Sequence, residues 1–356
     1  MPERPLSIYA RPLLLGSLAL AVALAVALGG TMLTSSAAHA QRPDTAAFRR
    51  AAEYSKGERG DAVLVMIDGR IVFEDYHNGG AANKTHLLAS GTKSFTGVMA
   101  VAAAQDGLLS FDEPVSQTIQ EWRNDPQRAA ISIRQLLTLT SGLEAGRQLS
   151  PPAYAEAVTG AMRAAPGSKF QYGPVSFQLF GEVMRRKLAP QQETVAQYLQ
   201  RRVLAPVGIR VGFWRGMTQG QPQLPHGAYL TAREWVKFGE FVRQGGKVGA
   251  KQVLPPELLA ELFKGTSANP AYGMTWWLNA DVPPALREEI KQLEDNMTGL
   301  DRVPGLEGMV TAAGGFKQRL YVIPTRRMVV VRFGNSVGKQ FDDATFLGLL
   351  TGASLR

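Results

Sequence analysis

The chain of 356 residues contains no cysteine. This absence excludes a thiolate nucleophile, any disulfide and any metal centre built on cysteine. Stability must therefore come from a packed core, which a globular chain of this length with 45% hydrophobic residues can supply.

Histidine is nearly as scarce, with four in the whole chain. His39 lies in the N-terminal segment, and the others are His77, His86 and His226. No two of these three have the close spacing of a metal-binding pair, so we expect no metal and no cofactor. A Ser-His-Asp hydrolase requires a histidine late in the chain, and the last histidine of this sequence is His226.

Clusters of one charge are also missing. Lys and Arg number 39 against 30 Asp and Glu, a formal net charge of +9, but they form no run of the kind that binds nucleic acid. We therefore expect a soluble basic surface and no nucleic-acid partner.

The long hydrophobic run of the sequence lies near the N-terminus. Arg4 and Arg11 precede an apolar stretch from Leu13 to Gly30, and small residues ending in Ala40 complete the pattern of a signal peptide. Residues 1–40 thus predict an exported protein, periplasmic or secreted. The apolar stretch is close to the shortest that spans a bilayer, so an uncleaved segment would anchor the chain in a membrane through residues 13–30.

The pattern after residue 40 predicts an α+β fold in one domain, residues 41–356. Two β-rich runs flank Asp68-Gly69 near the start, and two more flank a turn at 324–327. Helical periodicity dominates the middle of the chain. We expect an antiparallel β-sheet flanked by helices and built from both ends of the chain, about 41–111 and 246–356, with a mostly helical part inserted at about 112–245. Helices are expected at 44–55, 90–105, 132–137, 152–163, 174–187, 193–204, 231–243 and 341–350.

A serine and a lysine lie three residues apart where an apolar helix is expected to begin. Ser90 and Lys93 would share one face of a helix that runs to about Gln105, so the hydroxyl and the amine could meet. That is the arrangement of a serine nucleophile whose base is a lysine. A second such pair, Ser336 and Lys339, lies in an expected loop between glycines. The helix context favours the first pair.

The spacing alone is also compatible with a structural role, in which Ser90 caps the helix and Lys93 is solvated. For Lys93 to accept a proton at neutral pH, its pKa must fall from about 10.4 by roughly three units, which corresponds to about 4 kcal/mol. The companion segments decide between the two roles. Leu88–Thr96, Ile131–Leu143 and Pro166–Tyr172 follow one another in this order.

Together these segments resemble the serine β-lactamase and penicillin-binding-protein superfamily, above all its class C-like branch of esterases, D-aminopeptidases, carboxypeptidases and 6-aminohexanoate-dimer hydrolases. The resemblance extends from the hairpin near residue 62 to the final helix and implies a β-lactamase/transpeptidase-like fold. It implies that Ser90 is the acylated nucleophile and Lys93 its proton partner. Tyr172 matches the tyrosine of the family's Tyr-x-Asn motif, which helps to move protons.

The resemblance also implies an oxyanion hole, and it shows what this chain lacks. The segment Ala312–Gly315 takes the place of the family's Lys/His-Thr/Ser-Gly motif, and the backbone N–H groups of Ser90 and Gly315 would bind the oxyanion. Pro174 replaces the asparagine of the second motif, and Ala312 replaces the cation of the third. The groups that would engage the amide and the carboxylate of a β-lactam or a peptide are therefore missing.

Other side chains could contact a substrate in their place. Lys317 and Arg319 are candidate cations, and Trp276 and Trp277 are candidate aromatic walls, although aromatic residues in strands are more often core residues. His226, in a loop between a proline and a glycine, could line the cleft or serve only the turn.

The residues and the resemblance together predict a serine hydrolase that forms an acyl-enzyme with a small-molecule or peptide-like ester or amide. Hydrolysis of β-lactams is less expected, because the carboxylate anchor is missing. The alternative is a non-catalytic penicillin-binding or cell-wall-sensing module with the same fold.

Overall fold

The structure is a computed structural model that describes residues 45–291, 303–337 and 341–353. The predicted signal peptide at 1–40 lies outside these ranges. Within them, no helix combines the length and the hydrophobicity that a membrane crossing needs.

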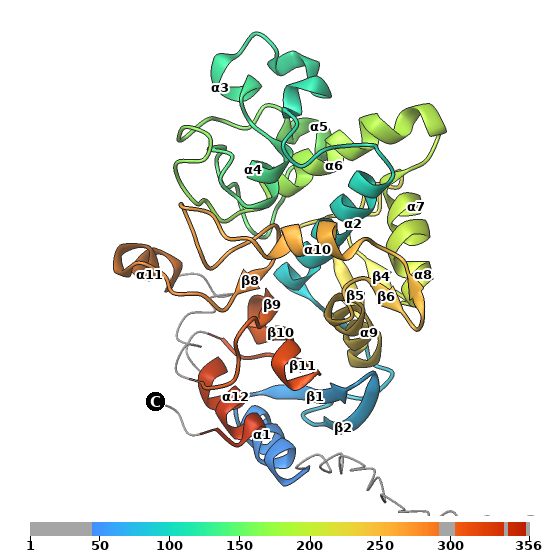
Figure 1. The fold of residues 1–356 in the computed structure, drawn as a ribbon, viewed down its shortest axis with the longest axis vertical. Helices are drawn as coiled ribbons and strands as arrows, with labels where there is room; N and C mark the ends of the chain where they lie inside the picture. The colour runs from blue at the N-terminus through green and yellow to red at the C-terminus, as the bar shows by residue number, and fades with distance from the viewer. Residues whose placement is uncertain (1–44, 292–302, 338–340, 354–356) are drawn as a thin grey trace, which may run out of the picture. The chain divides into compact units, whose positions relative to one another are not determined.

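A six-stranded antiparallel sheet is built from the two ends of the chain (Figure 1). The strand order is β2-β1-β11-β10-β9-β8, so the first hairpin pairs with the last strand, with Leu64 opposite Val331. This confirms the predicted sheet. The strands are β1 (Gly60–Ile67), β2 (Arg70–Tyr76), β8 (Trp277–Leu278), β9 (Val310–Gly314), β10 (Gln318–Ile323) and β11 (Met328–Gly334).

The turns of both predicted hairpins have the expected local chemistry. Asp68 and Gly69 have φ values of 50° and 74°, the left-handed pair that a tight two-residue hairpin requires. The turn between β10 and β11 is a 3₁₀ turn, η9 (Pro324–Arg326), closed by Arg327 in the left-handed region.

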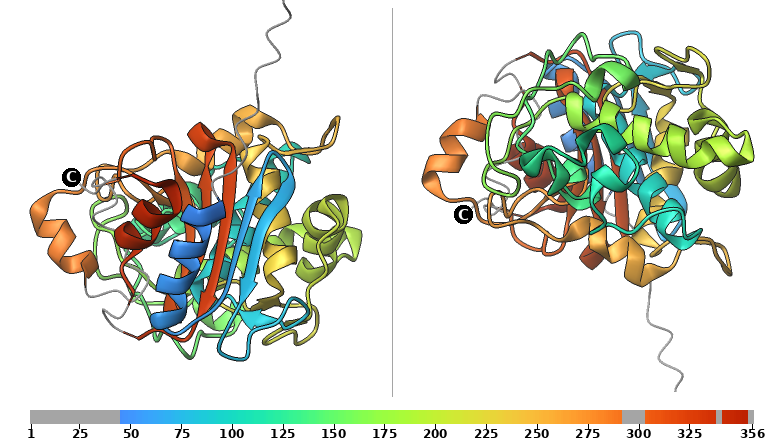
Figure 2. Two further views of the ribbon diagram at one scale, coloured as in Figure 1. Left: turned by 90° about the horizontal axis from the view of Figure 1, so that it is seen from below. Right: turned by 90° about the horizontal axis from the view of Figure 1, so that it is seen from above.

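Helices cover both faces of the sheet. The helices α1 (Thr45–Gly57) and α12 (Asp343–Thr351) lie side by side on one face (Figure 2). On the other face, α9 (Ala232–Arg243) packs against β10, β11 and β1. A helix on each side buries both faces of the central strands, which explains why β10 and β11 are buried along their whole length.

Most other helices lie between β2 and β8 in the sequence. They are α2 (Lys93–Gln105), α3 (Pro126–Ala129), α4 (Ile133–Leu137), α5 (Tyr154–Ala157), α6 (Val175–Leu188), α7 (Val195–Leu199), α8 (Ala205–Val207) and α10 (Pro256–Ala260), with α11 (Pro284–Lys291) following β8. Single helical turns are η1 (Ala89–Thr92), η2 (Val115–Gln117), η3 (Gln120–Trp122), η4 (Ala189–Gln191), η5 (Gln200–Leu204), η6 (Glu261–Phe263) and η8 (Gly315–Lys317). Two small sheets complete the fold, β3 (His86–Leu87) with β5 (Ala228–Leu230) and β4 (Phe213–Trp214), and β6 (Lys247–Val248) with β7 (Lys251–Gln252).

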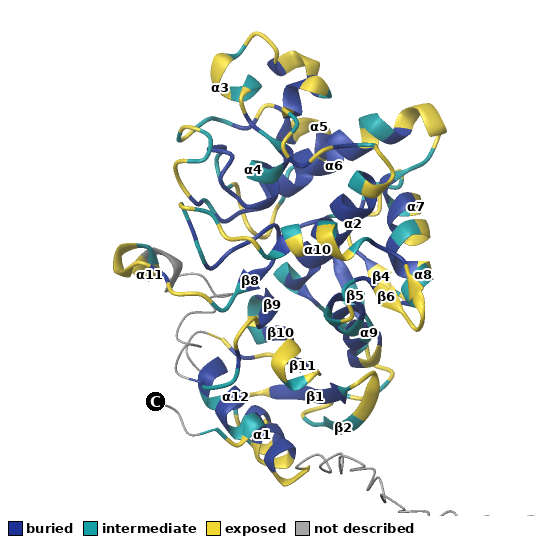
Figure 3. Cartoon of the chain, viewed as in Figure 1, coloured by how far each residue is buried: buried dark blue, intermediate teal, exposed yellow. Residues whose placement is uncertain are grey.

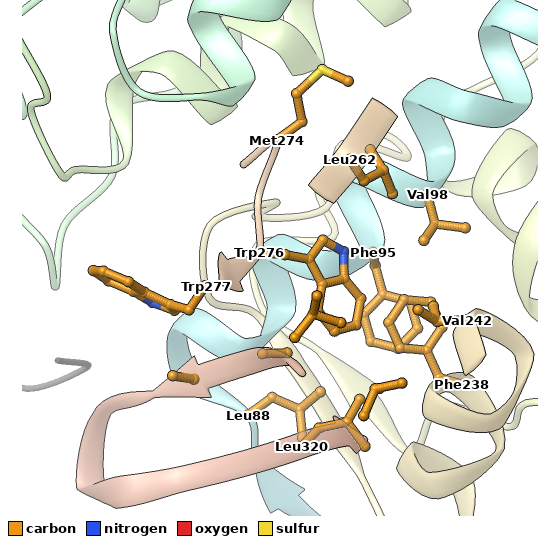
Figure 4. Packing of buried hydrophobic residues seen from close by; sticks show 14 of the residues in the cluster. Leu88, Phe95, Val98, Phe238, Val242, Leu262, Met274, Trp276, Trp277 and Leu320 are labelled. Carbon is orange, nitrogen blue, oxygen red and sulfur yellow. The ribbon is translucent and has the colours of Figure 1, made fainter. Parts of the chain in front are cut away.

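The helix α2 is buried for almost its entire length (Figure 3). Phe95 stacks on Phe238 of α9 with ring centroids 3.9 Å apart, and Phe238 stacks in turn on Trp276 (Figure 4). Each fully buried side chain of this size contributes roughly 1.5–3 kcal/mol. The packing therefore holds the N-terminal end of α2 in one position, which matters because Ser90 and Lys93 lie there.

Candidate active site

Ser90 lies in the 3₁₀ turn η1, directly before α2. Backbone bonds fix the turn on both sides: the Leu88 N–H donates to the Ala228 carbonyl of β5 at 2.9 Å, and the Gly91 N–H donates to the Leu88 carbonyl at 3.0 Å. Ala89 has a φ of 48°, a left-handed conformation that is unfavourable for alanine. Ser90 is half-buried, so its hydroxyl lies on a constrained turn within reach of solvent.

Lys93 is bonded to Ser90 as the spacing predicts. Its Nζ is 2.8 Å from the Ser90 Oγ and 3.2 Å from the Pro225 carbonyl oxygen. The lysine side chain is only 1% exposed, and Nζ lies 4.7 Å from the ring centre of Tyr172 and 5.5 Å from that of Phe177. Burial disfavours the ammonium form, whereas the rings and the carbonyl favour it. An amine in this position can exchange a proton with the serine hydroxyl.

Tyr172 is positioned by the second sequence segment. The capping box of α4, between Ser132 and Gln135, starts a short helix that ends at Leu137, and Leu139 follows with a φ of 60°. The Leu139 carbonyl accepts from the Gln171 N–H at 2.8 Å, which places the next residue, Tyr172, over Lys93. The structure thus brings Ser90 and Lys93 together with Tyr172 from a second segment.

The two tryptophans have different environments. Trp277 lies 5.8 Å from Tyr172 between ring centres and 5.0 Å from Tyr272, so it belongs to an aromatic group beside the site. Trp276 is fully buried between Phe238 and Phe263 (Figure 4), and its side chain offers no surface to a substrate. Neighbouring residues of an extended segment point to opposite sides, which explains the difference.

The two candidate cations also have different environments. Arg319 is 0% exposed, and its Nε lies 2.8 Å from the Asp343 Oδ1, so the structure does not bring this side chain to a substrate. Lys317 is half-buried in η8, and its backbone carbonyl accepts from the Arg332 Nη1 at 2.8 Å. Arg319 is the fifth residue after Gly314 and points into the core from β10.

The predicted oxyanion segment lies against the serine turn. A Cβ on Gly314 would come within 2.0 Å of the Leu88 carbonyl oxygen and 3.0 Å of the Gly91 nitrogen, so only glycine permits this approach. Gly315 follows as the first residue of η8, which contacts η1. The close approach brings the Gly314–Gly315 peptide beside Ser90.

His226 lies next to the carbonyl that binds Lys93. Burial, and then the positive charges of Lys93 and Arg215, lower the pKa of His226 to about 4, so the imidazole is neutral at pH 7. Pro225 itself, whose carbonyl bonds Lys93, was not singled out from the sequence. No local signal could have revealed it, because 132 residues separate the two partners.

One group of side chains in the described part of the chain has ligand atoms suited to a metal. Oxygen or nitrogen atoms of Glu53, Asp75 and His77 lie within 4.8 Å of one another. The His77 Nε2 lies 3.0 Å from the Asp75 carboxylate, and Glu53 is ion-paired with Lys56 at 3.4 Å. The group belongs to α1 and the β2 edge, whereas Ser90 faces the β9 side of the sheet, so it takes no part in the chemistry of Ser90.

Comparison with known proteins agrees with this architecture. Residues 38–352 match the family model described as Beta-lactamase. An uncharacterized protein of Alkalihalophilus pseudofirmus is 24% identical over 315 residues, which cover 78% of this chain and 84% of that protein. Among solved structures, EstCE1, a hydrolase with promiscuous acyltransferase activity, has a TM-score of 0.66 at 18% identity and covers 87% of this chain and 98% of that one. The D-alanine carboxypeptidase AmpC of Burkholderia cenocepacia has a TM-score of 0.63 at 17% identity, with 86% and 98% covered.

Proposed function

The chain belongs to the β-lactamase family, and from that premise we propose that it is a serine hydrolase that forms an acyl-enzyme on Ser90 with an ester or amide substrate. The observation that carries the proposal is the 2.8 Å contact between Ser90 Oγ and the buried Lys93 Nζ. A serine hydroxyl is a weak nucleophile by itself, and a base within hydrogen-bond reach is what activates it.

The steps follow from the contacts. Lys93, once it has released its own extra proton, takes the hydroxyl proton as the Ser90 Oγ attacks the carbonyl carbon of the substrate. The oxyanion that forms accepts hydrogen bonds from the N–H groups of Ser90 and Gly315, and one such donor is typically worth about 3 kcal/mol of barrier. Collapse expels the alcohol or amine, which receives the proton from Lys93 with the Tyr172 ring beside it. Water then attacks the acyl-enzyme by the same route and releases the acid.

The substrate class is inferred from what surrounds these groups. Pro174 and Ala312 stand where a side-chain amide and a cation would hold a β-lactam or a peptide carboxylate, and both are buried. Beside Tyr172 lie the rings of Phe170, Tyr272 and Trp277. These rings are buried, so the substrate class rests on the two replacements, which favour an ester or amide without a carboxylate.

The same two replacements favour a second candidate, a penicillin-binding or cell-wall-sensing module that has lost turnover. Its fold would be the same, so only chemistry distinguishes the two.

We further propose that the protein is exported by residues 1–40, which N-terminal sequencing of the mature protein from the producing cells would test.

Labelling with a fluorophosphonate tests the function without knowledge of the substrate. The parent protein should be labelled and should hydrolyse p-nitrophenyl butyrate, and Ser90→Ala should do neither. Ser110→Ala, an exposed serine, is the matched control and should behave as the parent does. If Ser90→Ala is labelled as fast as the parent, the nucleophile is another residue.

A substrate panel then separates the candidates. Short and long p-nitrophenyl esters, D-alanine p-nitroanilide and nitrocefin cover esters, amides and β-lactams. We expect turnover of the esters to exceed that of nitrocefin. A parent protein that retains fluorescent penicillin but neither reacts with the fluorophosphonate nor turns over any ester would favour the binding module.

A further inference from the structure

Two arginines with no exposed surface lie side by side on neighbouring strands below the site. Arg319 of β10 is the register partner of Arg332 of β11, and both side chains are 0% exposed. A buried guanidinium is costly unless its donors are satisfied. The bonds that these two side chains make therefore indicate what they hold in place.

Arg319 is held in one orientation by the start of α12. Its Nε and Nη2 donate to the two carboxylate oxygens of Asp343 at 2.8 and 3.3 Å, and the Tyr321 hydroxyl donates to the same carboxylate. Burial alone would raise the pKa of Asp343, but the charge and the hydrogen bonds of Arg319 outweigh it and hold that pKa below its ordinary value. The pair is thus ionised, and the fork of the guanidinium is fixed.

The remaining nitrogen of Arg319 reaches the backbone at the end of β9. Nη1 donates to the Gly314 carbonyl oxygen and to the Gln318 carbonyl oxygen, both at 3.1 Å. The Gly314 carbonyl and the Gly315 N–H belong to the same peptide unit. In a trans peptide these two groups point in opposite directions, so a bond that fixes the carbonyl also aims the N–H.

The backbone around the Gly314–Gly315 peptide is intrinsically flexible or strained, so a bond that fixes this peptide matters. It joins two glycines, the residues with the widest backbone freedom. The two residues that follow, Phe316 and Lys317, both have φ values of 61°, a conformation unfavourable for side chains with a Cβ. Arg332 secures the far end of the same turn through the Lys317 carbonyl at 2.8 Å.

We propose that Arg319 is a positioning residue of the oxyanion hole: from the buried side it holds the Gly314–Gly315 peptide plane so that the Gly315 N–H is aimed at the oxyanion formed at Ser90. The positive charge also polarises the amide and makes its N–H a stronger donor. Asp343 acts indirectly, because it orients Arg319. The inference rests on the proposed function, because Gly315 is a donor only if Ser90 is acylated.

Three variants test this role. Arg319→Met removes the bond to Gly314, and Arg319→Lys keeps the charge with one donor in place of the fork. Tyr321→Phe is the matched control: it removes a buried bond to Asp343 and leaves the Arg319–Gly314 contact untouched. The measurements are kcat and KM on p-nitrophenyl butyrate, the second-order rate of fluorophosphonate labelling, and Tm.

The expected results separate positioning from stability. Arg319→Met should lower kcat and the labelling rate in parallel by about 10- to 100-fold, somewhat less than removal of a donor itself, with KM within threefold of the parent. Arg319→Lys should give an intermediate loss. Tyr321→Phe should lower Tm but keep kcat within threefold. If Arg319→Met does not fold, the positioning role is tested by comparing kcat of Arg319→Lys with kcat of Tyr321→Phe, with both variants assayed at the same fraction of folded protein.

Two distinct failures can be told apart. If the parent is active and Arg319→Lys loses no more kcat than Tyr321→Phe, or if its loss is all in KM, the positioning role is refuted while the proposed function stands. If the parent neither turns over the ester nor is labelled, the proposed function fails and this inference fails with it.

Discussion

Gly314→Ala is the substitution that most directly tests whether the serine turn and β9 must touch. The added Cβ would lie 2.0 Å from the Leu88 carbonyl oxygen and 3.0 Å from the Gly91 nitrogen. Both are backbone atoms of the turn that carries Ser90, so no side chain can swing away. Ordinary contact begins at about 3.4 Å, and β9 must therefore retreat from the turn by about 1 Å or more.

A displacement of this size has a cost in both stability and rate. Overpacking of a well-packed site costs about 1–3 kcal/mol of unfolding free energy. A misplacement of about 1 Å lowers the rate by about 100-fold, equivalent to about 2.7 kcal/mol of barrier. We expect kcat on p-nitrophenyl butyrate to fall by about that factor, because the Gly315 N–H moves away from the oxyanion.

Two glycine variants serve as controls for this experiment. Gly239→Ala on α9 places a Cβ 2.4 Å from the Val329 Cγ1 and 2.8 Å from the Leu320 Cδ1, a clash with side chains under the sheet rather than with the serine turn. Gly57→Ala meets nothing within 4 Å. The reasoning is refuted if Gly314→Ala, assayed well below its Tm, keeps kcat within threefold of Gly239→Ala.

Three further outcomes follow from the same structure. Lys93→Ala and Tyr172→Phe should each lower kcat by about 10²- to 10⁴-fold with the far-ultraviolet circular dichroism retained, and near-normal rates would contradict their proton-transfer roles. Stability should fall as the pH drops from about 6.5 to about 4, because the unfolded chain protonates His226 and His86 before the folded chain does. His226→Gln should reduce the dependence of Tm on pH in that interval, with His86 responsible for the part that remains. Ser132→Ala should cost about 1 kcal/mol through loss of the α4 capping box, measured by urea unfolding, and should leave KM unchanged.

Local patterns predicted the elements that depend on near neighbours in the chain. The Asp68-Gly69 hairpin, the buried helix after Ser90 and the capping box at Ser132 all form where the residues indicate. Helix lengths were less predictable. The helix expected at 152–163 is the four-residue α5, since prolines precede it and Gly160 follows it, and the one expected at 193–204 gives way to a π turn after Leu199.

Side-chain direction was the main thing that the sequence left open. Trp276 and Trp277 are adjacent and both buried, yet Trp276 packs against Phe238 and Trp277 packs against Tyr172. Arg319 has the pattern of a surface cation and is instead buried, because Asp343 and the Gly314 carbonyl meet it inside the fold. Asp343 lies 24 residues along the chain from Arg319, so the direction of this side chain depends on packing that no local window contains.

The sequence by itself determined the serine–lysine pair, because residues three apart on a helix meet whatever the rest of the chain does. It also determined the absence of thiol chemistry and the family resemblance of the ordered segments. The tertiary structure alone decided what surrounds the pair: the Pro225 carbonyl on Lys93, Tyr172 over it, and a buried guanidinium behind the Gly314 peptide. These contacts depend on the packing of strands and loops in the folded chain. Their geometry therefore forms only when the strands of the central sheet have paired.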